Sequence, residues 1–135
     1  TLNGRVCVRF GRRCEFWERV MGKRLDEFAA FRQQMNEKIL SADNLELKRF
    51  FNLDTAVYRG NALDTRTKEL MGLVASTVLR CNDCITYHMV RCSEEGVTDE
   101  EFYEALSVAL VVGGSIAIPH LRHAVAILEE IKSSK

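Results

Sequence analysis

The sequence contains a single proline, no excess of either charge and no long apolar run. One proline among 135 residues, with almost no alternation of apolar and polar residues, favours helices over strands. The 19 basic and 19 acidic residues cancel, so no overall basic field points to nucleic acid as a partner. The longest apolar stretch, residues 105–118, is broken by two glycines and two serines and is too short to cross a bilayer. We therefore expect an all-α protein that binds neither nucleic acid nor membranes.

Cysteine is present, but not in the pattern of a disulfide-stapled secreted domain. The chain has five cysteines, an odd number scattered over a medium-length sequence. With 47% apolar residues it can bury a core without covalent cross-links. The N-terminal segment has no continuous apolar stretch of the kind found in signal peptides. These observations predict a cytoplasmic protein.

The beginning of the chain is strongly basic. Within residues 1–24 the basic residues are Arg5, Arg9, Arg12, Arg13, Arg19, Lys23 and Arg24, and the acidic residues are Glu15 and Glu18. Such a segment is most simply a solvated tail, with a transit-like or anion-binding arm as the alternative. A long amphipathic helix is predicted over residues 16–40. We expect two parts, a basic arm with this helix over residues 1–45 and one compact helical unit over residues 46–135.

Caps and glycines predict the helices of the second part. A short helical or looping piece after residue 44 carries five core candidates, Leu45, Leu47, Phe50, Phe51 and Leu53. Asp64 or Thr65 can cap a mostly apolar helix that ends near Leu79, and Asn82 or Asp83 can cap the next one. The segment 98–101 is a capping box for a further helix, which Gly113-Gly114 ends, and a last helix follows near Pro119. The sequence thus predicts a bundle of about six helices.

Four chemically active residues follow one another at the spacing E-x11-C-x2-C-x3-H. They are Glu69, Cys81, Cys84 and His88. Because a helix turns by about 100° per residue, Cys81 and Cys84 lie about 60° apart around the axis, and Cys84 and His88 about 40°. The three side chains therefore face one way, and two cysteines three residues apart at a helix start can close a disulfide. The pattern predicts dithiol–disulfide chemistry.

The same residues suggest individual roles. His88 is placed to take a proton from Cys84, directly or through one water, because the attacking species must be a thiolate. Cys84 is therefore our candidate for the attacking sulfur. Once Cys84 is a sulfenic acid, Cys81 can condense with it and form a disulfide. Glu69, on the preceding helix, can orient His88 or accept the proton in relay.

This spacing resembles the alkylhydroperoxidase D-like branch of the carboxymuconolactone decarboxylase family. The segments DTRTKEL at 64–70 and GVTDEE at 96–101 are also similar to its small members, and the resemblance covers about residues 51–128. It implies an all-helical fold, homo-oligomers that are trimers or hexamers, and a CxxC pair that reduces hydroperoxides or passes electrons from a thiol donor to a peroxidase. Cys84 matches the family's peroxide-attacking cysteine, Cys81 its resolving cysteine, and His88 and Glu69 its proton relay. The chain departs at Asp83, where better-studied members have a histidine.

Other functions remain open on the sequence alone. A decarboxylase-like enzyme could use His88 and Glu69 on a small lactone without thiol turnover, and a non-catalytic oligomeric binding module could carry unused cysteines. The C-x2-C-x3-H pattern also offers three zinc ligands, with Cys92, His120, His123 or Glu69 as a fourth, but no second ligand pair accompanies it. We expect a thiol-disulfide oxidoreductase with neither metal nor cofactor.

Residues outside the motif have simpler explanations. Cys92 lies about 12 Å along the helix from Cys84 and is expected to fill core. His120 and His123 are expected on the surface or at an interface, with the redox pocket as the alternative, and Tyr87 can contact substrate or pack. The nearly apolar segments 70–79 and 105–112 present more hydrophobic surface than one chain of this size can hide. Partner subunits are expected to cover the excess.

Overall fold

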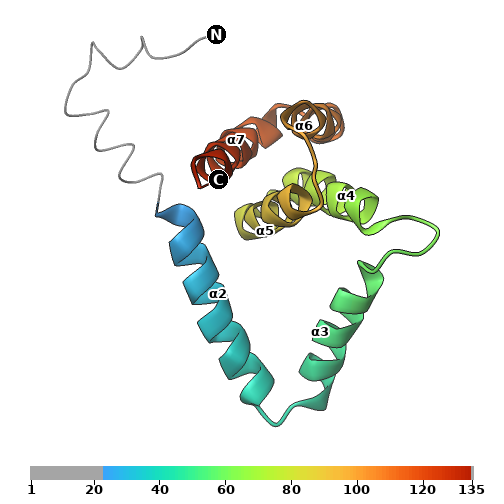
Figure 1. Cartoon of the computed structure of the whole chain (residues 1–135), viewed down its shortest axis with the longest axis vertical. Helices are drawn as coiled ribbons and strands as arrows, with labels where there is room; N and C mark the ends of the chain where they lie inside the picture. Colours follow the sequence, from blue (N-terminus) through green and yellow to red (C-terminus); the bar gives the residue numbers. More distant parts are fainter. Residues whose placement is uncertain (1–22, 135) are drawn as a thin grey trace.

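The computed structural model describes residues 23–134, and every regular element within them is helical (Figure 1). In chain order the elements are α2 (Arg24–Ser41), α3 (Leu45–Val57), α4 (Thr65–Val78), α5 (Asn82–Glu94), α6 (Asp99–Gly113), the short 3-10 helix η2 (Ser115–Ala117) and α7 (Ile118–Ser133). The prediction of an all-α fold with about six helices is confirmed. Residues 1–22, which hold most of the basic arm, Cys7, Cys14 and the predicted start of the first helix, lie outside the described residues, and the division of the chain at residue 45 stays a prediction.

Helices α4 to α7 form the packed part of the molecule. α4 lies against α5 and α6, and α5 lies against α7. Their shared core contains Leu73, Ile85, Met89, Cys92, Val97, Phe102, Leu106, Ala124, Ile127, Leu128 and Ile131. Apolar side chains from four helices therefore meet in one cluster, and this cluster fixes the relative positions of α4 and α5, which carry the sequence motif.

Helices α2 and α3 form an arm beside the packed part and enclose a V-shaped gap in the ribbon view (Figure 1). Neither helix has a buried residue. The prediction that the apolar residues of α3 belong to the core is wrong for this chain, because α3 extends away from α4–α7. The exposed fractions are 58% for Leu45, 41% for Leu47, 67% for Phe50 and 59% for Leu53, and Phe51 is half-buried.

A backbone hydrogen bond joins the start of the arm to the packed part. The backbone N–H of Leu25, in the first turn of α2, donates a hydrogen bond of 3.1 Å to Oε2 of Glu130 on α7. The side chain of Lys23, the residue before α2, does not cap this helix. A carboxylate from a distant helix thus performs the capping role that a local Ser, Asp or Asn usually has.

Local capping explains where the other helices begin. Asp64 accepts from the N–H of Thr67 at 2.7 Å, and Thr98 and Glu101 form the predicted capping box at the start of α6. Arg66 of α4 pairs with Glu101, so the two helix starts are tied together. Pro119 lies in the first turn of α7, where a missing backbone N–H costs no helical hydrogen bond. The predicted cap of α5 by Asn82 or Asp83 is wrong, because Cys81 is the capping residue.

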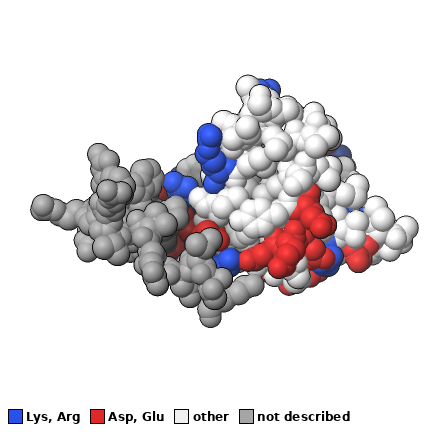
Figure 2. Space-filling model, turned by 90° about the horizontal axis from the view of Figure 1, so that it is seen from above, with Lys and Arg blue, Asp and Glu red and all other residues white. Residues whose placement is uncertain are grey.

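Charged and apolar side chains are unevenly distributed over the described surface. No helix within residues 23–134 is both long and apolar enough to cross a bilayer. In the view from above, acidic side chains gather in one band and a wide neighbouring area carries no charged residue (Figure 2). Exposed apolar side chains also occur on α6, where Val111 is 86% and Val112 67% exposed.

Candidate active site

The two motif cysteines lie at the N-terminus of α5 and form a disulfide, with their Cα atoms 5.3 Å apart. Arg80 turns the chain between α4 and α5 with a φ of 61°, in the left-handed region that few non-glycine residues adopt. Cys81 follows in an extended conformation as the N-cap, and its Sγ accepts the backbone N–H of Cys84 at 3.3 Å. The predicted position of the CxxC pair is therefore confirmed. Cys84 is exposed and Cys81 half-buried.

One turn further along α5, His88 is bonded to the carboxylate of Glu69. Its Nδ1 lies 2.7 Å from Glu69 Oε2, and the two residues are 7% and 1% exposed. A carboxylate can only accept, so the imidazole donates its Nδ1–H and keeps Nε2 as the basic nitrogen. The spacing of the motif predicts that Glu69 of α4 can orient His88 of α5, and the carboxylate and the imidazole are in direct contact.

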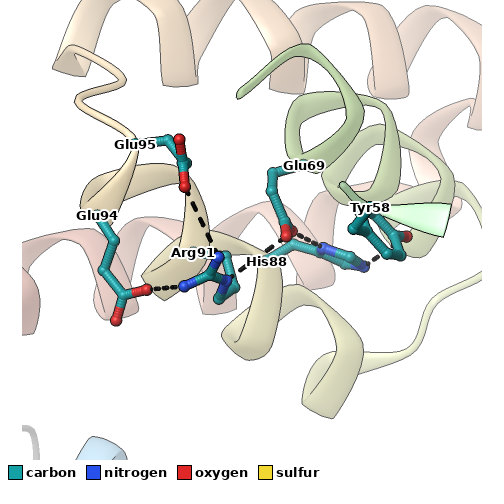
Figure 3. Close-up of polar contacts among 6 residues, drawn as sticks. All are labelled: Tyr58, Glu69, His88, Arg91, Glu94 and Glu95. Carbon is teal, nitrogen blue, oxygen red and sulfur yellow. Dashed lines mark hydrogen bonds and ion pairs between the residues drawn. The ribbon is translucent and has the colours of Figure 1, made fainter. Parts of the chain in front are cut away.

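Arg91, one turn beyond His88, completes the surroundings of Glu69. Its Nε lies 3.5 Å from Glu69 Oε1, while its other nitrogens pair with Glu94 and Glu95 (Figure 3). A buried carboxylate is costly unless it is hydrogen-bonded or paired, and here one oxygen faces an imidazole and the other a guanidinium. Both oxygens of Glu69 therefore have partners, and the carboxylate holds His88 in one orientation.

A glycine on α4 provides the space that the imidazole occupies. A Cβ added to Gly72 would lie 2.5 Å from Cε1 of His88 and 2.7 Å from Nε2. Such distances are shorter than any ordinary contact, so a side chain at position 72 and the present position of His88 exclude each other. Gly72 follows Glu69 by three residues and therefore lies on the same face of α4.

Cys84 and His88 open onto a common pocket of about 350 Å³. Its wall combines α2, the end of α3 and the first turns of α5, and its residues are Phe28, Phe31, Arg32, Met35, Asn36, Asp54, Tyr58, Asp83, Cys84, Tyr87 and His88. Most of the lining is apolar. The pocket therefore lies where the arm meets the packed helices, and α2 contributes Phe28 and Phe31 to its wall.

Two tyrosines flank the imidazole inside this pocket. The Tyr58 hydroxyl lies 3.4 Å from Nε2 of His88, and the two rings are tilted at a centroid distance of 5.3 Å (Figure 3). Tyr87 contacts the imidazole edge-on at 5.2 Å, and Arg32 lies over the Tyr87 ring at 4.5 Å. Burial, followed by the negative charge of Glu69, raises the pKa of both phenols, so both hydroxyls stay protonated at neutral pH.

The histidines of α7 contact α5 on a different side. His123 Nε2 lies 2.8 Å from the Thr86 hydroxyl, and His120 Nδ1 lies 2.7 Å from Oδ1 of Asn82, the residue after Cys81. Neither lines the pocket that Cys84 and His88 share. Burial lowers the pKa of His123, with a further contribution from Arg24. These two hydrogen bonds connect α7 to the beginning of α5.

The remaining described cysteine lies in the core. Cys92 has no exposed surface, and burial raises the pKa of its thiol to about 12. Such a thiol is almost entirely protonated at neutral pH and is a poor nucleophile. Among residues 23–134 no group of three or more His, Cys, Asp or Glu side chains is arranged to hold a metal ion.

Three residues around Glu69 and His88 were not identified from the sequence, namely Gly72, Arg91 and Tyr58. Arg91 and Gly72 could have been inferred from helical spacing, since each follows a motif residue by three positions. Tyr58 had no such signal. It is at the end of α3, and only the path of the connection from α3 to α4 brings it to His88.

Comparison with known proteins agrees with this geometry. Residues 46–130 match the carboxymuconolactone decarboxylase family. A Paracoccus denitrificans protein known as uncharacterized protein 4 in cox locus is 37% identical over 82 residues, which cover 61% of this chain and 74% of that protein. The alkyl hydroperoxide reductase AhpD of Corynebacterium kroppenstedtii is 35% identical over 54 residues, which cover 40% of this chain and 31% of that protein.

A solved structure from Thermotoga maritima is similar over most of the chain. It belongs to a carboxymuconolactone decarboxylase family protein described as a candidate for the antioxidative response. The sequences are 64% identical, the match covers 79% of this chain and 91% of that one, and the TM-score is 0.76.

Proposed function

The chain belongs to the carboxymuconolactone decarboxylase family, and we propose that it is a thiol-disulfide oxidoreductase that reduces hydroperoxides, directly or by supplying electrons to a peroxidase. One observation carries this proposal. The Cys81–Cys84 disulfide lies at a helix N-terminus, and Cys84 shares a pocket with a histidine that a buried glutamate orients. The similarity to an alkyl hydroperoxide reductase and to a protein described in connection with the antioxidative response supports the same chemistry.

Oxidation begins at Cys84. In the reduced protein His88 takes the proton of the Cys84 thiol, and the thiolate attacks one oxygen of the hydroperoxide. The oxygen–oxygen bond breaks, Cys84 becomes a sulfenic acid, and the other oxygen leaves as an alcohol with the proton that His88 held. The Cys81 sulfur then attacks the Cys84 sulfur, its proton leaves with the hydroxyl as water, and the disulfide forms. The dithiol has given up two electrons.

Reduction requires an external dithiol, whose thiolate attacks the exposed sulfur of Cys84. Cys81 is the leaving group, and its Sγ already accepts the N–H of Cys84 at the N-terminus of α5. Both the hydrogen bond and the helix dipole stabilise a departing thiolate there. The second thiol of the donor then displaces Cys84, takes on the disulfide and leaves the protein reduced. Asp83 adds a negative charge beside the pair, which opposes thiolate formation and favours the electron-supplying role over fast peroxide reduction.

A hydroperoxide titration tests the proposal. Reduced protein is treated with one equivalent of cumene hydroperoxide, and free thiols are assigned by peptide mapping. In the wild type we expect the loss of the Cys81 and Cys84 thiols and the appearance of one disulfide between them. In Cys81→Ser the reaction should stop at a sulfenic acid on Cys84, which a dimedone label detects.

Cys92→Ser is the matched control and should leave the oxidation unchanged, because Cys92 is buried and protonated. Trapping the sulfenic acid on Cys92, or recovering both thiols of the pair intact, would contradict the proposal. Cys84→Ser separates the thiol mechanism from a lactone enzyme. A variant without Cys84 that still opens a lactone would show that Glu69 and His88 act without the sulfurs.

We further propose that copies of the chain assemble into a homo-oligomer. Large apolar side chains are exposed on α3 and α6, among them Phe50, Leu53, Val111 and Val112. Large exposed apolar side chains support burial against partner subunits, because extensive exposed apolar surface is typical of protein interfaces. Sedimentation equilibrium of wild type and of Phe50→Ser measures the mass directly, and a wild-type chain that stays monomeric at high concentration would contradict the prediction of a trimer or hexamer.

A further inference from the structure

The basic nitrogen of His88 has one side-chain partner among the described residues, and it comes from outside the sequence motif. Glu69 takes the Nδ1–H at 2.7 Å, so Nε2 must perform the proton transfer. The Tyr58 hydroxyl is 3.4 Å from this nitrogen. Cys84, His88 and Tyr58 all line the same pocket. The Tyr58 hydroxyl therefore lies beside the nitrogen that receives the proton of the Cys84 thiol.

A tyrosine hydroxyl can serve both protonation states of the imidazole. It donates to a neutral Nε2, and it accepts from Nε2–H once the imidazole has taken the proton. A hydrogen bond from an ionised donor is roughly twice as strong as one between neutral groups, so the phenol favours the imidazolium more than the free base. The consequence is a stronger base beside Cys84.

The two tyrosines of the pocket are not equivalent in this respect. Tyr58 presents its hydroxyl to His88, whereas Tyr87 presents its ring edge-on and has Arg32 over its face. Removal of the hydroxyl from Tyr58 deletes a contact to the basic nitrogen, and the same change at Tyr87 leaves its ring contacts in place. The chain therefore contains its own matched control.

We propose that Tyr58 is a positioning residue for the thiol chemistry: its hydroxyl holds Nε2 of His88 toward the pocket, and it accepts a hydrogen bond from Nε2–H after Cys84 is deprotonated. The role given to Tyr58 rests on the proposed function, whereas the experiment that tests it does not require that function. The charged and titratable groups around His88 are Arg32 of α2, Asp54 of α3, Glu69 of α4, and Asp83, Tyr87 and Arg91 of α5. All of them are retained in the Tyr58→Phe variant.

The experiment measures the rate at which iodoacetamide alkylates reduced Cys84 as a function of pH, since only the thiolate reacts. Loss of one hydrogen bond of about 1 kcal/mol corresponds to roughly a fivefold change, so Tyr58→Phe should slow alkylation at pH 7 about fivefold and move the midpoint to higher pH. At a pH well above the midpoint its rate should equal that of the wild type. Tyr87→Phe should leave the midpoint where the wild type has it.

A Tyr58→Phe profile with an unshifted midpoint, or equal shifts in the two tyrosine variants, would overturn the inference. The ¹⁵N chemical shift of His88 Nε2 provides a second reading, because it reports the hydrogen bond directly, and an unchanged shift in Tyr58→Phe would also overturn it. Failure of the proposed function looks different. In that case the wild-type Cys84 is not oxidised by hydroperoxide, while the midpoint difference between the tyrosine variants persists.

Discussion

The packed helices α4–α7 and the arm α2–α3 differ sharply in how they bury their apolar residues. The former share a core in which Leu73, Ile85 and Phe102 are at most 1% exposed, whereas neither arm helix has a buried residue. The reactive groups come from the packed part, and much of the pocket wall comes from the arm. The part with the buried core thus holds the reactive groups, and the arm forms much of the wall around them.

The largest expected contrast is between aromatic truncations in the two regions. Phe102→Ala should lower the free energy of unfolding by about 3–5 kcal/mol, because it removes a fully buried ring and leaves a cavity. Phe50→Ala, at 67% exposure, should change it by no more than about 0.5 kcal/mol. Urea unfolding at a concentration where the chain is monomeric measures both. Equal losses would mean that the arm is packed in solution in a way that the single chain does not show.

A methyl group added at Gly72 should disturb the active site directly, because it would overlap the imidazole of His88. Gly72→Ala is expected to displace His88, to cost about 1–3 kcal/mol of stability by overpacking and to slow Cys84 alkylation at neutral pH. Gly113→Ala is the control, because its new Cβ would meet its nearest neighbour at an acceptable 3.4 Å. If the two variants alkylate at the same rate, the close contact between α4 and the imidazole does not position the base.

Glu130 tests how the arm is attached. Glu130→Ala removes the acceptor for the Leu25 N–H and should cost about 1 kcal/mol, the usual effect of losing an N-cap. Amide hydrogen exchange should accelerate in α2 and remain slow in α4. Glu129→Ala, which removes a neighbouring exposed carboxylate paired with Lys132, should leave α2 protected. Equal acceleration in both helices would show that Glu130 supports the whole fold.

The smallest effect on stability is expected from the titration of His123, which contacts Thr86 of α5. The pKa of His123 is lowered in the folded protein, so between that value and 6.5 the unfolded chain binds a proton that the folded chain does not. Stability should therefore fall as the pH drops below about 6.5. In His123→Gln the decline of Tm between pH 7 and pH 5 should be shallower. A variant with the wild-type slope would locate the titrating group elsewhere.

The packed region could be predicted from the sequence much better than the arm. Asp64 and the capping box at Thr98 and Glu101 mark helix starts by local hydrogen bonds, and these signals do not depend on the rest of the fold. The prediction that α3 packs into the core was wrong. Apolar spacing indicates that one face of a helix will be buried, but it does not indicate whether the same chain or a partner buries it. Cys81 was missed as the cap of α5 because a thiol seldom has that role.

The site divides in the same way. Cys84 and His88 lie one turn apart on a single helix, so helical geometry alone places them on one face. Glu69 needed only that adjacent helices α4 and α5 pack together, which the short connection between them makes the natural outcome. The roles assigned to Cys81, Cys84, His88 and Glu69 remain predictions for the hydroperoxide titration to decide.

The sequence by itself determined the helices of the packed part, the caps of α4 and α6, and the face on which the two sulfurs and the imidazole meet, because hydrogen bonds and periodicity within a few residues are sufficient for these. Only the tertiary structure decided that Tyr58 lies beside His88, that Glu130 caps α2 and that the pocket has an aromatic wall. Each of these contacts joins residues far apart in the chain, and their meeting depends on how whole helices pack. No local pattern contains that information.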